Sequence, residues 1–195
     1  MYWYKSRHFI LAGTSLALAF VLSLPACKPD IKETGAQLKF FDLKGYFAKD
    51  SIRLTHQNPL ITKTASHNKV SETKKVHIAN WGTELALFKE SDINKPAWRD
   101  SYKAETSEDI TTYRATDPDL KTREIMIKQV NGKVKWIFIY NYTKVVLFKY
   151  KNTEKRFYET SEELSYFPDS LYTINKKQTV LLIGTNFYNI KGVFN

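Results

Sequence analysis

Two segments in the first half of the chain carry apolar residues at helical spacing. The residues that repeat in this way within residues 38–58 are Phe40, Leu43, Phe47 and Leu54. Pro59 then blocks continuation of the pattern. The second segment begins at Asn80, a residue type that caps helices well, and ends before Pro96. We therefore expect two amphipathic helices, with Trp81 and Phe88 on the buried face of the second.

The rest of the chain is typical of β-strands joined by short loops. A hairpin is expected between residues 60 and 78. Further strands are expected at residues 102–106, 110–116, 123–130, 133–142, 145–150, 156–160, 171–174 and 179–184, with one more toward residue 194. No helical pattern follows Pro96, which favours an antiparallel meander. The predicted fold class is α+β, with two N-terminal amphipathic helices packed on one large antiparallel meander sheet.

The dipeptide Asn131-Gly132 is the strongest local signal in the strand region. Both residue types tolerate the positive φ that a two-residue type I′ turn requires, so the flanking segments should form a hairpin. Counting back from this turn places Ile127 opposite Trp136. The second strand of the hairpin is then apolar on both faces near its end, which predicts a central position in the sheet.

One face of that strand carries an aromatic stripe formed by Trp136, Phe138, Tyr140 and Tyr142. An open sheet face lined with aromatic rings can stack on sugars or hold an acyl chain. The alternative is that the helices cover the stripe, and we expect this for Trp136 and Phe138. Tyr140 and Tyr142 lie nearer the strand end and have polar tips, so they are the candidate binding residues.

The N-terminus has the layout of a secretory signal. Lys5 and Arg7 precede an apolar run over residues 9–22. An uncleaved membrane anchor is one alternative, but the run is shorter than the roughly 20 residues that span a bilayer. Residues 28–37 are polar and are expected to form a flexible tether. Residues 38–195 should then form a single α+β domain.

The apolar run leads into Leu24-Pro25-Ala26-Cys27, which resembles the lipobox of bacterial lipoprotein precursors. An ordinary signal peptidase site fits less well, because it needs a small residue where Leu24 stands. The resemblance implies that residues 1–27 contain a lipoprotein signal peptide cleaved before Cys27. Cys27 then becomes the mature N-terminus, and its thiol carries the lipid that binds the protein to a membrane. Lys28 at the next position resembles an outer-membrane address.

Cysteine content and charge add two constraints. Cys27 is the only cysteine, so no disulfide can form within the chain. The formal charge of +10 falls to +8 when Lys5 and Arg7 leave with the signal peptide. Export excludes nucleic acid as a partner and leaves anionic lipid head groups, lipopolysaccharide phosphates or acidic glycans. The lysines are scattered rather than grouped in a block, which favours a solvated surface over a dedicated anionic site.

Signatures of catalysis and metal binding are absent from the sequence. The histidines have no metal-ligand spacing, no serine stands in a Gly-x-Ser-x-Gly elbow, and no glycine-rich loop could hold a phosphate. Two acidic clusters remain. Asp117-Pro118-Asp119 is explained by turn chemistry, and Glu162-Glu163 by a solvated loop or short helical turn. We therefore expect no catalytic residue, no metal and no cofactor.

The mature part is similar to short uncharacterised lipoproteins of Bacteroidota through residues 91–98 and 167–172. This resemblance implies no activity. Two tripeptides, beginning at Asp50 and Asp169, also match the Asp-Ser/Thr-apolar pattern of O-glycosylation in that phylum, with Ser51 and Ser170 as the acceptors.

Three functions are compatible with these features. The first is a non-enzymatic envelope lipoprotein that binds a lipid, a glycan or a protein partner on its sheet. The second is a structural or accessory subunit of an envelope complex. The third is an envelope hydrolase that uses a carboxylate pair, for which two carboxylates in one cleft would be the sign.

Overall fold

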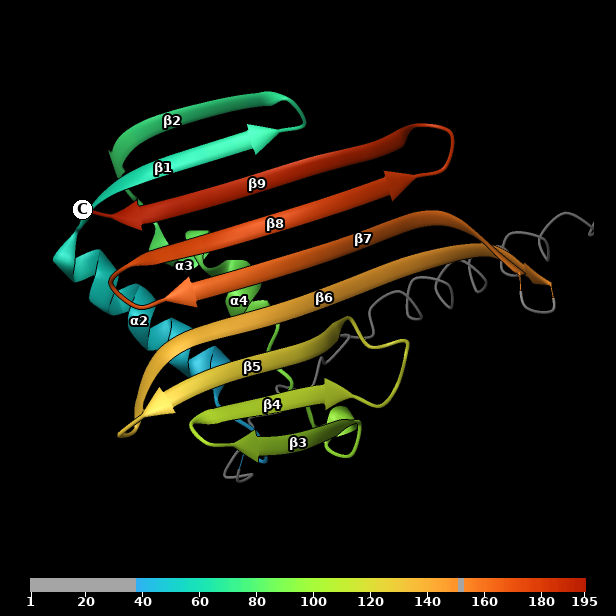
Figure 1. Ribbon diagram of the computed structural model, residues 1–195, viewed down its shortest axis with the longest axis horizontal. Coiled ribbons are helices and arrows are strands. Elements are labelled where there is room, and N and C mark those ends of the chain that lie inside the picture. Colours follow the sequence, from blue (N-terminus) through green and yellow to red (C-terminus); the bar gives the residue numbers. More distant parts are fainter. Residues whose placement is uncertain (1–37, 151–152) are drawn as a thin grey trace, which may run out of the picture. The chain divides into compact units, whose positions relative to one another are not determined.

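A nine-stranded antiparallel sheet forms the body of the protein (Figure 1). The computed structural model describes residues 38–150 and 153–195. The strands are β1 Leu60–His67, β2 Val70–His77, β3 Tyr102–Ser107, β4 Ile110–Ala115, β5 Thr122–Val130, β6 Lys133–Tyr150, β7 Thr153–Phe167, β8 Leu171–Val180 and β9 Gly184–Phe194. Their order across the sheet is β2-β1-β9-β8-β7-β6-β5-β4-β3.

The predicted antiparallel meander is confirmed for β3 to β9, because each of these strands pairs with the next along the chain. The hairpin β1–β2 joins this meander in a way that local sequence patterns do not indicate. β1 pairs with β9, so the first and last strands are neighbours. β2 and β3 are therefore the two edges of the sheet.

Several predicted strands are parts of longer ones. The segments 133–142 and 145–150 together form β6, and the segments 171–174 and 179–184 overlap a single β8. Residues 133–150 contain no glycine or proline to interrupt the ladder. Pairs of polar residues continue the hydrogen-bonded ladder through positions where loops were expected. Glu162 on β7 lies opposite Asn141 on β6 and opposite Lys176 on β8.

In residues 38–150 and 153–195, one long and two short α-helices pack on one face of the sheet. They are α2 Leu43–Gln57, α3 Trp81–Glu84 and α4 Ala86–Glu90, and the 3₁₀-helix η1 Pro96–Trp98 follows. α2 begins later than predicted because Asp42 caps it, accepting a hydrogen bond from the Gly45 N–H at 2.7 Å. Asn58 ends α2 in a left-handed conformation, before Pro59.

The predicted second helix is interrupted at Leu85, so that α3 and α4 replace one continuous helix. Asn80 caps α3 as expected, accepting a hydrogen bond from the Thr83 N–H at 3.0 Å. Trp81 and Phe88 are fully buried on the side that faces the sheet.

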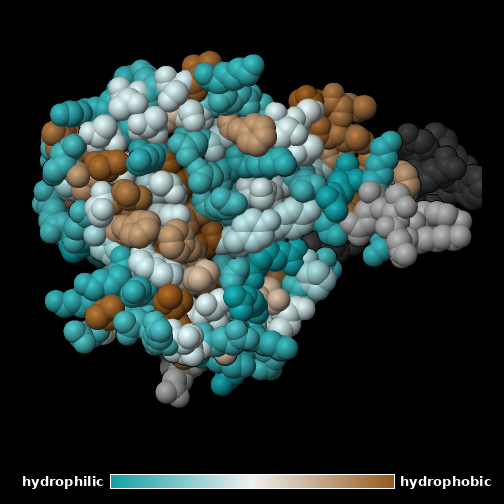
Figure 2. Space-filling view, viewed as in Figure 1, coloured by the Kyte–Doolittle hydropathy of each residue, from teal (hydrophilic) through white to brown (hydrophobic). Residues whose placement is uncertain are grey.

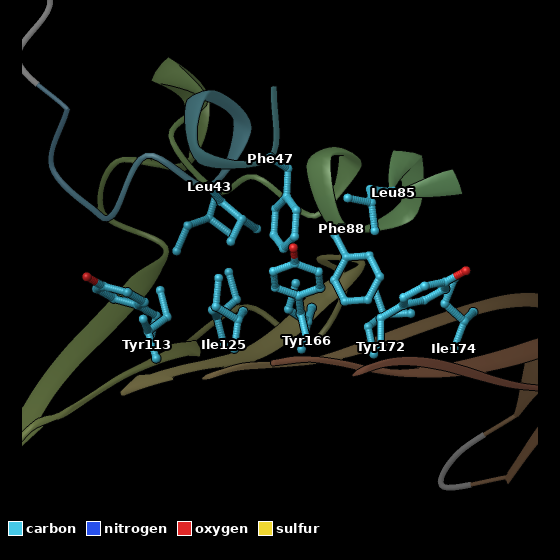
Figure 3. Close-up of a cluster of buried hydrophobic side chains, with 14 of the residues drawn as sticks. Leu43, Phe47, Leu85, Phe88, Tyr113, Ile125, Tyr166, Tyr172 and Ile174 are labelled. Carbon is cyan, nitrogen blue, oxygen red and sulfur yellow. The ribbon is translucent and has the colours of Figure 1, made fainter. Parts of the chain in front are cut away.

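The core lies between these helices and the sheet (Figure 3). Phe47 from α2 and Phe88 from α4 meet the ring of Tyr166 on β7, with centroid distances of 5.1 and 5.9 Å. Within the described residues, the buried apolar side chains fall between Phe40 and Ile174. Residues 38–195 therefore contain this core, and they form one compact unit.

The Asn131-Gly132 turn has the predicted conformation, but the register beyond it differs from the prediction. Both residues have positive φ, at 52° and 72°. Val130 lies opposite Lys133 as counted, yet further along Ile127 lies opposite Ile137 instead of Trp136. A β-bulge causes this shift, since the register slips by one residue after Gln129.

Isoleucine burial explains the bulge. The shifted register brings four isoleucines to the helix-covered face, namely Ile125, Ile127, Ile137 and Ile139. Without the shift, the isoleucines of β5 and those of β6 would lie on opposite faces. Burying a side chain of this size contributes about 1.5–3 kcal/mol, whereas the bulge leaves only one residue unpaired.

Buried tyrosines connect the sheet to the helices through their hydroxyl groups. The Tyr166 hydroxyl on β7 donates a hydrogen bond to the Asp50 carboxylate on α2. The Tyr172 hydroxyl on β8 donates to Glu84 on α3 at 2.6 Å. Burial raises the pKa of Tyr166, and the neighbouring Asp50 charge raises it further.

We expect Gly132→Val to lower the free energy of unfolding by about 1–2 kcal/mol, because a β-branched residue is strained at positive φ. Chemical denaturation would measure the change. Lys133→Val is the matched control, since Lys133 is exposed and already in a strand, where valine is favoured. Equal stability of Gly132→Val and the unmodified protein would contradict the type I′ turn.

The raised pKa of Tyr166 predicts a loss of stability in alkali. Above about pH 10, the unfolded chain releases the tyrosine proton while the folded protein keeps it, so stability falls as the pH rises toward the folded-state pKa. We expect Tyr166→Phe to remove up to about 1.4 kcal/mol of this loss per pH unit. Denaturation at increasing alkaline pH would measure the slope. Identical slopes for Tyr166→Phe and the unmodified protein would refute the prediction.

Candidate functional site

No helix of the described residues covers the sheet face opposite α2, α3 and α4 (Figure 1), and we call it the open face. The bulge in β5–β6 directs the aromatic stripe toward this face, so the expectation that helices cover Trp136 and Phe138 is wrong. Both residues are only half-buried. Phe138 contacts Trp136 and Phe167, with centroid distances of 4.8 and 5.6 Å. Tyr140 is 38% exposed next to this aromatic cluster.

A row of side chains crosses the open face at the level of Tyr140. Tyr140 lies opposite Glu124 on β5 and Glu163 on β7. Glu163 lies opposite Asn175 on β8, which lies opposite Asn189 on β9. These five residues, which we call the transverse row, sit side by side on five adjacent strands. Across adjacent strands about 4.8 Å apart, they span about 19 Å.

Two shallow hollows meet at Glu163 in the middle of the transverse row. One has a volume of about 340 Å³ and is lined by Met126, Phe138 and Tyr140 among others. The other has a volume of about 380 Å³ and is lined mainly by polar residues, with Phe187 as an apolar wall. Both hollows are open to solvent. Figure 2 shows the surface of the open face, on which hydrophilic groups surround apolar patches.

The two carboxylates of the transverse row have different surroundings. Glu124 accepts a hydrogen bond from Arg114 Nε at 2.9 Å, and Arg114 also binds Glu105 at 3.0 Å. Glu163 is exposed between Tyr140 and Asn175. The Asn189 amide donates a hydrogen bond to the Asn175 side-chain oxygen. The row therefore offers both hydrogen-bond donors and acceptors beside an aromatic ring.

Glu162 and Glu163 do not form a pair, because neighbouring residues of a strand point to opposite faces. The expectation of a loop or helical turn at these residues is wrong, since both belong to β7. Glu162 is 4% exposed on the helix-covered side. Its oxygens lie 3.4 Å from Lys121 Nζ and 3.5 Å from Lys176 Nζ, which compensates the buried charge.

Tyr142, the other sequence-based candidate, lies apart from the two hollows. It is half-buried, and its ring is 5.5 Å from the Arg123 guanidinium carbon. Partial burial raises the pKa of Tyr142, and Glu159 contributes to the same shift. The structure thus groups Tyr140 with the transverse row and places Tyr142 against a separate, smaller hollow that includes Lys121 and Arg123.

The remaining predicted features can be placed briefly. His56 lies in the last turn of α2, and His67 is at the end of β1, where it stacks on Tyr188 at 4.5 Å. Ser51 is half-buried in α2 and donates a hydrogen bond to the Phe47 carbonyl, whereas Ser170 is exposed in the β7–β8 turn. In residues 38–150 and 153–195, no group of three or more His, Cys, Asp or Glu side chains is arranged to hold a metal ion.

Cys27, the predicted lipid-attachment residue, lies outside the described residues, as do the signal peptide and the tether. Within the described part of the chain, no helix is both long and apolar enough to cross a membrane.

No family model, no curated protein and no solved structure matches this chain.

Proposed function

We propose that this protein is an envelope lipoprotein, anchored through lipid on Cys27, which binds a glycan chain across its open face. The observation that carries the glycan proposal is the transverse row. It places an aromatic ring, carboxylates and amides on adjacent strands, at one level of an exposed sheet.

A sugar chain matches this chemistry better than an acyl chain does. The apolar faces of sugar rings stack on aromatic side chains such as Tyr140 and Phe138, while their hydroxyl groups donate to carboxylates and exchange hydrogen bonds with amides. An acyl chain needs an enclosed apolar pocket. Both hollows are open and have polar groups at their rims, so they suit an extended polar ligand.

The envelope hydrolase remains a second candidate because of one observation. Glu124 and Glu163 flank Tyr140 from the two neighbouring strands, about 9–10 Å apart by strand spacing. This is a backbone separation, and side chains of this length can bring the two carboxyl groups to the distance of about 6.5–9.5 Å that inverting glycosidases use. Glu124 is already engaged by Arg114 Nε at 2.9 Å, which leaves Glu163 as the more accessible carboxylate of the two.

Replacing Cys27 by Ser should abolish labelling of the full-length protein with a fatty-acid analogue in a bacterial host, because the thiol that receives the lipid is lost. An unlipidated precursor should accumulate. Labelling and maturation equal to those of the unmodified protein would refute the anchor. Lys28→Ser, which keeps the cysteine, serves as the control and should still be labelled.

Binding of residues 38–195 to an array of bacterial envelope glycans, with soluble peptidoglycan fragments included, would test the glycan proposal. We expect Tyr140→Ala to weaken binding about three- to tenfold through lost stacking, and Tyr140→Phe to keep most of the affinity. Tyr142→Ala should have the smaller effect, because Tyr142 lines neither of the two hollows that meet at Glu163.

Matched acidic variants add a second comparison on the same array. Glu163→Gln should weaken binding, whereas Glu90→Gln on α4 should not, since Glu90 is exposed on the helix side. No binding to any envelope glycan, or equal binding by all variants, would reject the proposal. New reducing ends formed by the unmodified protein but not by Glu163→Gln would instead identify a hydrolase.

A further inference from the structure

The β6–β7 hairpin extends beyond the rest of the sheet as a two-stranded ribbon (Figure 1). The pairing of β5 with β6 ends at Asn141, and the pairing of β7 with β8 ends at Tyr158. Past these points, β6 and β7 pair only with each other. An isolated two-stranded hairpin is marginally stable in water, so a projecting ribbon is best explained by something that it contacts.

Large apolar side chains are exposed along this ribbon. They are Val145, Leu147, Phe148 and Phe157, each about half exposed. The adjacent β8–β9 turn adds Leu182 and Ile183, which are 98% and 77% exposed. The two groups are neighbours, because the Leu181 N–H donates a hydrogen bond to the Phe157 carbonyl at 2.9 Å. We call these six residues the apolar tip.

Leucine is energetically unfavourable at position 182 unless its side chain contacts a partner. It has a φ of 69°, a conformation that glycine or asparagine adopts more readily. It also places a whole isobutyl group in solvent. Figure 2 shows this turn as a brown patch at the end of the sheet.

The ribbon that carries most of the apolar tip has an excess of cationic residues. The described part of residues 144–159 contains Lys144, Lys149, Lys155 and Arg156 against Glu154 and Glu159, a net charge of 4 − 2 = +2. Arg156 binds Glu159 at 2.8 Å, so the positive charge of the ribbon is an excess over its internal ion pairs. On β8, Lys177 lies four residues before the β8–β9 turn and opposite Phe187 of β9. Apolar side chains at the ends of turns, with lysine and arginine behind them, match the chemistry of an anionic bilayer, where acyl chains lie beneath phosphate groups.

We propose that the apolar tip inserts into the surface of an anionic phospholipid membrane while the neighbouring lysines contact its head groups. This contact is separate from the glycan site, because the apolar tip lies beyond the points where the β5–β6 and β7–β8 pairings end. It involves no residue of the predicted lipid anchor. It gives the folded domain its own affinity for the membrane.

A site-specific dye tests this insertion. Residues 38–195 contain no cysteine, so Leu182→Cys introduces a single thiol for an environment-sensitive fluorophore. Val70→Cys is the matched control, because Val70 is also exposed at the end of a hairpin but lies on the edge strand β2. We expect the dye at position 182 to shift to the blue with vesicles of phosphatidylglycerol and phosphatidylcholine. The dye at position 70 should not shift.

Vesicles of phosphatidylcholine alone should give a much smaller shift, and added salt should weaken binding to the anionic vesicles. No shift at position 182, or equal shifts at the two positions, would overturn the proposal. A blue shift without vesicles that grows with protein concentration would also overturn it, because it would identify a second copy of this chain as the partner.

Sedimentation with the same vesicles gives a second measurement without a dye. The double variant Leu182→Ser with Ile183→Ser should bind about tenfold more weakly than the unmodified domain, since both side chains lose their apolar contact. Val70→Ser should bind normally. Retention of full binding by the double variant would contradict insertion. Neither experiment contains a glycan, so its outcome is independent of the glycan proposal.

Discussion

The attachment of the helices to one face of the sheet is the interaction on which the rest of the structure depends. A sheet of nine strands is apolar enough to need cover, and the described chain supplies only α2, α3, α4 and η1. The Tyr166–Asp50 and Tyr172–Glu84 hydrogen bonds join two of these helices to the middle of the sheet. Arg53 strengthens the first contact by binding both Asp50 and Asp169 at 2.6 Å. Removing either buried carboxyl would leave a tyrosine hydroxyl without its acceptor, which is costly in a low-dielectric core.

Because the described helices cover only one face of the sheet, the side chains on the open face contact solvent. Because no described helix reaches the open face, its strands must alternate apolar residues toward the core with polar residues toward solvent. Many positions follow this rule, and the aromatic cluster around Phe138 is an exception. Because this cluster lies next to the transverse row, with its carboxylates and amides, it is more informative than aromatic content alone. The same side chains beneath a helix would be ordinary core.

Turns, helix caps and the order of consecutive strands were predictable from the sequence, whereas the register between strands was not. The Asn131-Gly132 turn, the Asn80 cap and the meander of β3 to β9 follow from residue types that act over a few positions. The bulge between Lys128 and Gln129 could not be predicted in this way. It places the isoleucines of β5 and β6 on the same face, and that face is identified only when the helices are packed on the sheet. Glu163 was missed for a related reason. Its place beside Tyr140 depends on the register of three strands, and its neighbour Glu162 suggested a solvated loop.

The two proposed surfaces have a fixed geometric relation, because both are built on β6 and β7. The strands lead from the transverse row toward the apolar tip, and Phe148 is eight residues beyond Tyr140 on β6, or about 26 Å at strand rise. A domain that meets a membrane with its tip would have its strands directed away from the bilayer. The transverse row crosses those strands, so a glycan bound along it would run roughly parallel to the membrane surface. The length of β6 relative to its neighbour β5 would then set the height at which that glycan is held.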